Sequence, residues 1–245
     1  MTAARTAGPD DVLVVNEIFG PTVQGEGPSA GTRCAFLRLG GCNLTCSWCD
    51  TPYTWDWKGV SEHGRPHDPR AELHPMRAHE VLDRLRAFGV GLVVVSGGEP
   101  LTQQHRLRHV LAGLRRAGVE VEVETNGTIP PSPELVELGV WFNVSPKLRH
   151  SGVDPARALV GEALTEFAAC GRGRFKFVCR DRADLVEVAE VVDAHGLSPV
   201  WIMPLGRSAD AVLAGLRELA DATVRRGWNL TPRLHVLAWE DRRGV

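Results

Sequence analysis

The sequence has almost no net charge and no long hydrophobic run. Its 28 Lys and Arg residues are offset by 30 Asp and Glu residues, which leaves a formal charge of −2. Because the two signs are interspersed, no long-range field favours nucleic acid or an anionic membrane, and we expect neither as a partner. No stretch approaches the roughly 18–20 apolar residues that a membrane span needs, and the N-terminal MTAARTAGPDD lacks the apolar run of a signal peptide. We therefore expect a cytoplasmic protein.

The cysteines do not suggest a disulfide framework. Such frameworks are rare in reducing compartments, and three of the six cysteines sit within eight residues. Clustering of this kind indicates a metal site. We expect the other three, Cys34, Cys170 and Cys179, to be ordinary buried thiols.

No low-complexity segment, short repeat or Ser/Gly-rich linker divides the chain. Residues 1–11 resemble a loose polar lead. Residues 12–245 are predicted to form a single catalytic domain, since single α/β barrels commonly run to about 200–250 residues.

Strands that are apolar almost throughout alternate with amphipathic helices, a pattern typical of a mainly parallel sheet whose outer face is covered by helices. The predicted core strands, about six, are 34–39, 92–96, 121–125, 141–145, 175–179 and 200–204, and a last strand is predicted around Arg233 to Leu237. The predicted helices are 76–88, 103–117, 133–138, 156–169, 183–195 and 209–226. This α/β pattern fits either an open doubly wound sheet or a curved partial barrel. Both place functional groups at the carboxyl ends of the strands.

The segment from Thr51 to Pro75 differs from the rest of the chain. It carries Trp55, Trp57, several prolines and three histidines without a clear period. Long loops of this kind are usually functional, so we predict an excursion over the active site.

The strongest motif is GGCNLTCSWCDT (40–51), which places Cys42, Cys46 and Cys49 in a C-x3-C-x2-C arrangement directly after strand 34–39. A four-iron cubane has four corners and normally takes four thiolates. Three local cysteines leave one iron open, and that iron can chelate the amino and carboxylate groups of S-adenosylmethionine, a placement that allows reductive release of a 5′-deoxyadenosyl radical.

The alternative is a structural zinc site, which needs four Cys or His ligands. It could recruit Cys34, His63, His67 or His74. No second C-x2-C knuckle accompanies the motif, which counts against zinc.

The cysteine motif resembles that of the radical S-adenosylmethionine superfamily. SGGEP (96–100) is similar to the superfamily's GGEP motif, whose backbone meets the methionyl amine. ETNGT (124–128) and SPK (145–147) end two further predicted strands and would face the same rim. Each of the three could also be simple turn chemistry, because Gly-Gly, Asn-Gly and Ser-Pro are common at strand ends.

Three further segments closely resemble the 7-carboxy-7-deazaguanine synthase family: NEIFGPTVQGEGPSAG (16–31), FLRLGGC (36–42) and CDTPYTW (49–55). The resemblance implies that 6-carboxy-5,6,7,8-tetrahydropterin is converted to 7-carboxy-7-deazaguanine with loss of ammonia, on the route to queuosine and other 7-deazapurines. It also implies a modified, incomplete (β/α) barrel, a homodimer, and an electron donor such as flavodoxin or ferredoxin.

The resemblance assigns residues to three cofactors and a substrate, and it assigns no certain catalytic residue, since the radical arises at the cluster. Cys42, Cys46 and Cys49 would hold a 4Fe-4S cluster, and Thr51 would bind Mg²⁺, which keeps several waters and borrows substrate oxygens. The residues expected against S-adenosylmethionine are Trp48, Cys49, Asp50, Gly98, Ser145, Pro146 and Lys147. Those expected against the substrate are Val23, Gln24, Gly25, Arg38, Ser96 and Val245. Gln24 can both donate to and accept from the pterin edge, and Arg38 can pair with a carboxylate.

One departure concerns the C-terminal segment, where familiar proteobacterial members have Thr-His-Lys and this chain has LHVLAWEDRRGV (234–245). Two other functions stay open. A glycyl-radical activating enzyme shares the cysteine spacing but has no evident use for QGEG or for Thr51. A non-catalytic iron–sulfur or zinc module would need no rim of ligand-binding motifs.

Overall fold

The structure is a computed structural model that describes residues 11–245, so the loose lead predicted for residues 1–11 lies, except for Asp11, outside the described residues. The described strands are β1 (Val12–Val23), β2 (Arg33–Leu39), β3 (His74–Arg77), β4 (Leu92–Gly97), β5 (Glu120–Thr125), β6 (Trp141–Val144), β7 (Gly173–Cys179), β8 (Val200–Pro204) and β9 (Asn229–Leu230). The α-helices are α1 (Pro69–Glu72), α2 (Ala78–Ala87), α3 (Gln104–Arg116), α4 (Pro133–Glu137), α5 (Pro155–Ala158), α6 (Gly161–Ala169), α7 (Asp184–His195), α8 (Ala209–Arg225) and α9 (Leu234–Trp239). The 3-10 turns are η2 (Gly27–Ser29), η3 (Pro52–Thr54), η4 (Pro100–Gln103) and η5 (Arg149–Ser151).

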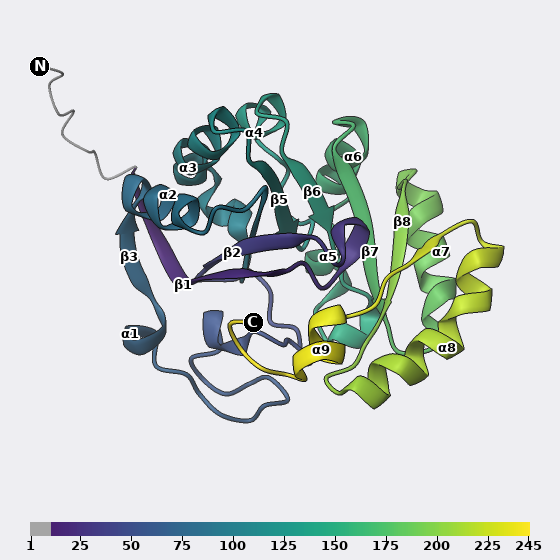
Figure 1. Cartoon of the computed structure of the whole chain (residues 1–245). Helices are drawn as coiled ribbons and strands as arrows, with labels where there is room; N and C mark the ends of the chain where they lie inside the picture. The colour runs from purple at the N-terminus through teal and green to yellow at the C-terminus, as the bar shows by residue number, and fades with distance from the viewer. Residues whose placement is uncertain (1–10) are drawn as a thin grey trace, which may run out of the picture.

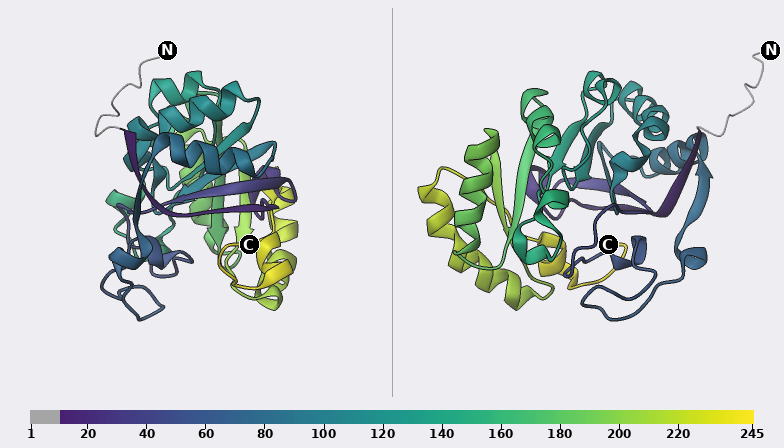
Figure 2. Two further views of the ribbon diagram at one scale, coloured as in Figure 1. Left: turned by 60° about the vertical axis from the view of Figure 1, so that its left-hand side comes forward. Right: turned by 180° about the vertical axis from the view of Figure 1, so that it is seen from behind.

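The strands form one curved, open sheet. In residues 11–245 the strand order is β3-β1-β2-β4-β5-β6-β7-β8-β9, and the ladders from β2 through β9 are parallel. A doubly wound sheet reverses its strand order at a switch point, whereas this order runs in one direction. The edge strands β3 and β9 do not pair with each other within the described chain. The fold is therefore the partial barrel, with the six predicted core strands β2 and β4 to β8, and its major helices lie on the outer face (Figure 1, Figure 2).

Both faces of the core strands are buried, which explains their nearly continuous apolar sequences. Along β4, Val93 and Val95 face the helices in the main core. Val94, between them, points to the inner face and packs with Cys34 and Phe36 in a small inner core. This inner core fills one part of the barrel and leaves the carboxyl ends of the strands for polar groups.

Two predicted helices are present but differ from the prediction in their continuity or their first residue. The single helix expected at 156–169 is two helices, α5 and α6, with a break at Leu159 and Val160, where Val160 has an extended backbone (φ −91°, ψ 98°). Met76, expected to begin a helix, lies in β3, so α2 begins at Ala78.

The strand predicted around Arg233 to Leu237 is also wrong, because this segment is helix α9 and the last strand, β9, is Asn229–Leu230. The alternation of apolar and polar residues in LHVL imitates a strand. The backbone groups of this segment do not form a strand ladder: Leu234 N–H donates to Gly25 O (2.8 Å), and Leu237 N–H donates to Arg233 O (3.1 Å).

Strand β1 is absent from the sequence-based prediction. It pairs antiparallel with β2 and β3, and its register shifts between Val15 and Glu17 and again between Phe19 and Thr22. These irregularities interrupt the alternation that identifies a strand. Across residues 11–245, none of the helices combines the length and apolar character that crossing a bilayer would require.

Candidate active site

A cavity of about 620 Å³ lies at the carboxyl ends of the parallel strands. Its wall is built from the cysteine loop, the ends of β4 to β8, the 51–75 excursion and residues 241–245. The curvature of the sheet gathers these segments, which are up to about two hundred residues apart in the chain, around one space.

The three motif cysteines line this cavity together. Two of the sulfurs receive N–H groups: Leu44 N–H lies 3.5 Å from Cys42 Sγ, and Trp55 Nε1 lies 3.3 Å from Cys49 Sγ. Donors of this kind stabilise a thiolate and tune an iron–sulfur cluster. The loop therefore offers three thiols and supporting donors, a set that fits a cluster with one open iron.

Burial governs the ionisation of these thiols. It raises the pKa of Cys42 to about 12 and also raises the pKa of Cys46 and Cys49. Lys147 opposes burial at Cys46, because its positive charge favours the thiolate. Iron bound here would supply the remaining positive charge that thiolate ligands need.

The SGGEP turn packs directly on the cysteine loop. Gly98 lies so close to the carbonyl of Gly41 that a Cβ at this position would overlap it, and Glu99 N–H donates to the same carbonyl (2.8 Å). A larger residue at position 98 would separate the two loops. The glycine is thus required by the close approach of two backbones.

Glu99 ties this turn to ETNGT. Its fully buried carboxylate accepts hydrogen bonds from Leu101 N–H (2.9 Å), Thr125 Oγ1 (2.9 Å) and Asn126 N–H (2.7 Å). Burial raises the pKa of Glu99 even though these three donors lower it. Glu99 thus acts as a brace between two strand ends, and the sequence motif is structural at this position.

The group expected against S-adenosylmethionine forms one side of the cavity. Lys147 Nζ donates to Ser145 Oγ (2.9 Å) and lies 5.5 Å from the centre of the Trp48 ring. Arg207 donates to the carbonyls of Trp48 (3.1 Å) and Cys49 (3.2 Å) and so fixes the loop. The indole Nε1 of Trp48 is buried without a hydrogen-bond partner among residues 11–245.

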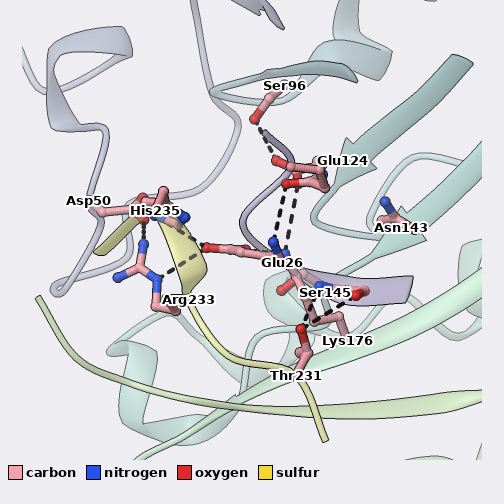
Figure 3. Close-up of polar contacts among 12 residues, drawn as sticks. Glu26, Asp50, Ser96, Glu124, Asn143, Ser145, Lys176, Thr231, Arg233 and His235 are labelled. Atoms are coloured by element: carbon pink, nitrogen blue, oxygen red, sulfur yellow. Dashed lines mark hydrogen bonds and ion pairs between the residues drawn. The ribbon is translucent and has the colours of Figure 1, made fainter. Parts of the chain in front are cut away.

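A buried ion-pair network borders the cavity on the side of QGEG (Figure 3). Glu26 pairs with Lys176 from β7 and with Arg233, whose Nε lies 3.1 Å from Glu26 Oε1. Arg233 also pairs with Asp50, next to the last cluster cysteine. The network links QGEG, the cysteine loop and the chain before α9.

The charges in this network reinforce one another. Burial alone would raise the pKa of Glu26, but Lys176 and Arg233 hold it well below its usual range. Burial lowers the pKa of nearby His235, which favours its neutral form near neutral pH. Gly25 is required here because a Cβ would overlap the His235 ring.

A second polar group surrounds Glu124, which accepts a hydrogen bond from Ser96 Oγ (2.8 Å), as Figure 3 shows, and another from Gln24 Nε2 (3.1 Å). Nearby, Asn143 lines the cavity and its Oδ1 is buried without a partner within the described chain. A buried acceptor of this kind fits a ligand N–H.

Arg38 reaches the cavity from β2. Its Nε pairs with Glu17 Oε1 at 2.7 Å, and its guanidinium lies 5.9 Å from the centre of the Tyr53 ring. Thr51 lies at the start of the excursion, with its hydroxyl 3.7 Å from Cys49 Sγ. A neutral hydroxyl beside the cysteines is a hard oxygen donor suited to Mg²⁺.

Apart from Pro146, the structure brings the sequence-predicted site residues to this one cavity. Those that line it are Cys42, Cys46, Cys49, Thr51, Trp48, Asp50, Gly98, Ser145, Lys147, Val23, Gln24, Gly25, Arg38, Ser96 and Val245. Pro146 is buried between two lining residues and does not line the cavity itself. The excursion also contributes to the wall, as expected for residues 51–75.

Among the alternative zinc ligands, His63 and His67 line the same cavity, and His63 Nε2 lies 3.0 Å from the carbonyl oxygen of Cys49, whereas Cys34 and His74 do not line it. Cys34 packs with Phe36 and Val94 in the inner core, whereas the motif cysteines adjoin Leu44 and Val153. Cys34 and Cys179 are fully buried and Cys170 is partly buried, as ordinary packed thiols are.

Several cavity residues are absent from the sequence-based prediction. They are Glu26, Glu124, Lys176, Arg207, Arg233 and His235. Glu26 and Glu124 stand inside the motifs QGEG and ETNGT, and Lys176 is a charge within the apolar strand FKFVC, so each carried a signal. No feature of the local sequence indicated that Arg207 or Arg233 would reach the cavity.

The fold and the cavity define the class. The three cysteines follow the carboxyl end of the first parallel strand of a partial barrel, and their loop packs against a GGEP turn. This is the arrangement of a radical S-adenosylmethionine enzyme. Residues 37–147 match the family model of the radical SAM superfamily.

More specific similarities cover nearly the whole chain. It is 39% identical to the 7-carboxy-7-deazaguanine synthase of Pyrobaculum aerophilum, over 94% of this chain and 96% of that protein. It is 36% identical to the enzyme of the same name from Hyperthermus butylicus, over 95% of each chain. The crystal structure of QueE from Escherichia coli has the same fold, with a TM-score of 0.65, 24% identity, and 90% and 93% of the two chains covered. The chain belongs to the 7-carboxy-7-deazaguanine synthase family.

Proposed function

We propose that this protein converts 6-carboxy-5,6,7,8-tetrahydropterin to 7-carboxy-7-deazaguanine with loss of ammonia, a step of 7-deazapurine biosynthesis. The observation that carries the proposal is the polar cavity beside the three cysteines, which holds Arg38, Glu124 and the unpartnered acceptor of Asn143. These groups suit a heterocycle that bears N–H donors and a carboxylate. A glycyl-radical activating enzyme must instead admit a loop of a large protein.

The cofactors of this family fit the residues present. Cys42, Cys46 and Cys49 would hold a 4Fe-4S cluster, and S-adenosylmethionine bound to it supplies a carbon radical when the cluster is reduced. The residues of the chain then position the bound S-adenosylmethionine and substrate and exclude water. Gly98 allows the methionyl group to approach the backbone, and Trp48, Asp50, Ser145 and Lys147 would border the rest of the molecule. Pro146 would set the direction of the SPK turn between the last two.

The substrate groups have matching partners. Arg38 would pair with the substrate's carboxylate, and Gln24 would hydrogen-bond to the pterin edge beside Ser96. Val23 and Gly25 would supply backbone contacts, and Val245 would close the far side. Thr51 would contribute one hydroxyl to Mg²⁺, which takes its other ligands from water and substrate oxygens.

The finer organisation also belongs to this proposal. Residues 12–245 would act as one catalytic domain and assemble as a homodimer. A small electron-transfer protein such as flavodoxin or ferredoxin would reduce the cluster. We propose the cytoplasm as the place of action, because a reducing compartment keeps the cysteines available as ligands.

The test is an anaerobic assay of the reconstituted, reduced protein with S-adenosylmethionine, Mg²⁺ and 6-carboxytetrahydropterin, followed by mass spectrometry. We expect 7-carboxy-7-deazaguanine, and we expect none from Cys46→Ala, which also loses the visible absorbance of the cluster. The control Cys170→Ala should keep both, because Cys170 lies outside the cavity. Formation of 5′-deoxyadenosine without the deazaguanine would refute the substrate assignment and favour an activating enzyme.

A further inference from the structure

The C-terminal segment of residues 240–245 turns back from α9 toward the cavity. Figure 1 and Figure 2 show it leaving α9 and ending beside the 51–75 excursion. Asp241, Arg243 and Val245 line the cavity. The segment is therefore part of the wall, although it comes from the opposite end of the chain to the cysteine loop.

Arg243 attaches this segment to two other parts of the wall. Its Nε lies 3.1 Å from Glu17 Oε2 on β1, and its Nη2 lies 2.9 Å from Glu72 Oε2 on α1. Nη2 also donates to Asn16 Oδ1 (3.1 Å), and the guanidinium lies 3.9 Å from the centre of the Tyr53 ring. One side chain thus joins the C-terminal segment, β1 and the excursion.

The backbone before Arg243 is strained. Glu240 has φ 55° and ψ −152°, a conformation that side chains other than glycine rarely adopt, and it has the one positive φ among non-glycine residues 11–245. Such strain persists where surrounding contacts determine the path of the chain. Glu240 is held on one side by its own contacts, since its carboxylate accepts a hydrogen bond from Ala209 N–H (3.2 Å), and the contacts of Arg243 fix the chain three residues further on.

Glu17 connects the same attachment to substrate binding. One of its oxygens pairs with Arg38 (2.7 Å), and the other pairs with Arg243 (3.1 Å). Both guanidinium groups also lie over Tyr53. Without Arg243, the charge of Glu17 would act on Arg38 alone and reduce its attraction for a second carboxylate.

We propose that Arg243 is a positioning residue for the substrate: by sharing Glu17 with Arg38 and bonding Glu72, it holds residues 240–245 over the cavity and keeps Arg38 available for the substrate's carboxylate. The inference rests on the proposed function. Arg243 acts through Arg38 and the segment it anchors, so its loss should weaken substrate binding more than turnover.

The experiment compares wild-type protein, Arg243→Ala, Arg243→Lys and Glu72→Gln, with Arg225→Ala as the matched control. Arg225 is an exposed arginine on α8 that has no ion pair in the part of the chain described. The dissociation constant of 6-carboxytetrahydropterin is measured anaerobically by calorimetry, and KM and kcat are measured separately. Hydrogen exchange of the peptide containing residues 240–245 reports on the attachment itself.

For Arg243→Ala we expect about a tenfold increase in KM and in the dissociation constant, with kcat changed less than about twofold, since two partly exposed ion pairs and a cation–π contact are lost. Arg243→Lys should recover part of the binding, and Glu72→Gln should show a smaller increase in KM. Exchange in residues 240–245 should become faster in Arg243→Ala and stay unchanged in Arg225→Ala.

If the wild-type protein binds and converts the pterin and Arg243→Ala has the same KM, this inference is overturned and the proposed function stays intact. Equal losses of kcat in Arg243→Ala and Arg243→Lys, without a change in KM, would also overturn it. A wild-type protein that neither binds the pterin nor forms the product would refute the proposed function, and this inference with it.

Discussion

Replacement of Glu26 by glutamine tests whether the buried ion-pair network stabilises the fold around the cavity. Glu26 is the shared partner of Lys176 and Arg233, whose side chains are 7% and 5% exposed. The substitution keeps the shape of the side chain and removes its charge. Two buried cations then lose their common counter-charge.

The expected loss of stability is about 3 kcal/mol. Removing one partner of a buried ion pair typically costs about 3–5 kcal/mol, because the remaining charge is desolvated without compensation. The lower end applies here because Lys176 keeps Glu124 at 3.9 Å, and Arg233 keeps Asp50 and the carbonyl of Gly206 (2.7 Å).

The dependence on pH gives a second, independent signature. The pKa of Glu26 in the folded protein lies well below its ordinary value of 4.5, because the cations outweigh the effect of burial. A carboxylate with a depressed pKa contributes its full stability above the unfolded pKa and loses it as the pH falls toward the folded one. The stability difference between wild type and Glu26→Gln should therefore be constant above about pH 5.5 and shrink by about 1.4 kcal/mol per pH unit below 4.5.

The assay is urea unfolding of the metal-free protein, followed by tryptophan fluorescence at pH 7, 5.5 and 4. Glu166→Gln is the control, since Glu166 is an exposed carboxylate on α6 without an ion pair within residues 11–245, and it should change stability by less than about 0.5 kcal/mol. A loss below about 1 kcal/mol for Glu26→Gln, or a loss that does not vary with pH, would refute the reasoning.

Three further substitutions test the walls of the cavity. Gly25→Ala should destabilise the protein by about 1–3 kcal/mol, because its Cβ would overlap His235. The control Gly91→Ala should cause no such loss, because the space around Gly91 is open, and urea unfolding compares the two variants. Asp56→Ala should cost about 3 kcal/mol and speed proteolysis of residues 57–66, because its carboxylate accepts three backbone N–H groups, at 3.4, 2.9 and 2.8 Å; unchanged proteolysis would contradict this. Thr51→Val should raise the Mg²⁺ concentration for half-maximal activity at least about tenfold without altering cluster absorbance, and an unchanged Mg²⁺ dependence would remove Thr51 from the metal site.

Features that depend only on residues close together in the sequence were predictable from the sequence. The three cysteines fall within one loop, so their spacing alone indicates a cluster with an open iron. The apolar strands 92–96 and 175–179 were recognisable because both faces of each are buried, as the packing of Val93 and Val94 on opposite faces of β4 shows.

Errors arose where local pattern and tertiary environment disagree. The residues of α9 alternate like a strand, but Leu234 N–H donates to Gly25 O and Leu237 N–H donates to Arg233 O, as in a helical turn. Strand β1 lacks a regular alternation because its register against β2 shifts between Val15 and Glu17 and again between Phe19 and Thr22. In both cases the deciding partner lies outside the segment itself: Gly25 for α9, and strand β2 for β1.

The sequence by itself determined the chemistry: a C-x3-C-x2-C loop, a GGEP turn and a QGEG segment, each a short stretch whose meaning needs no distant residue. Only the tertiary structure decided which charges share the cavity. Arg233 meets Asp50 across 183 residues, and Arg243 meets Glu17 across 226 residues. The physical reason is that ion pairing depends on distance in space, and the curvature of the whole sheet sets that distance.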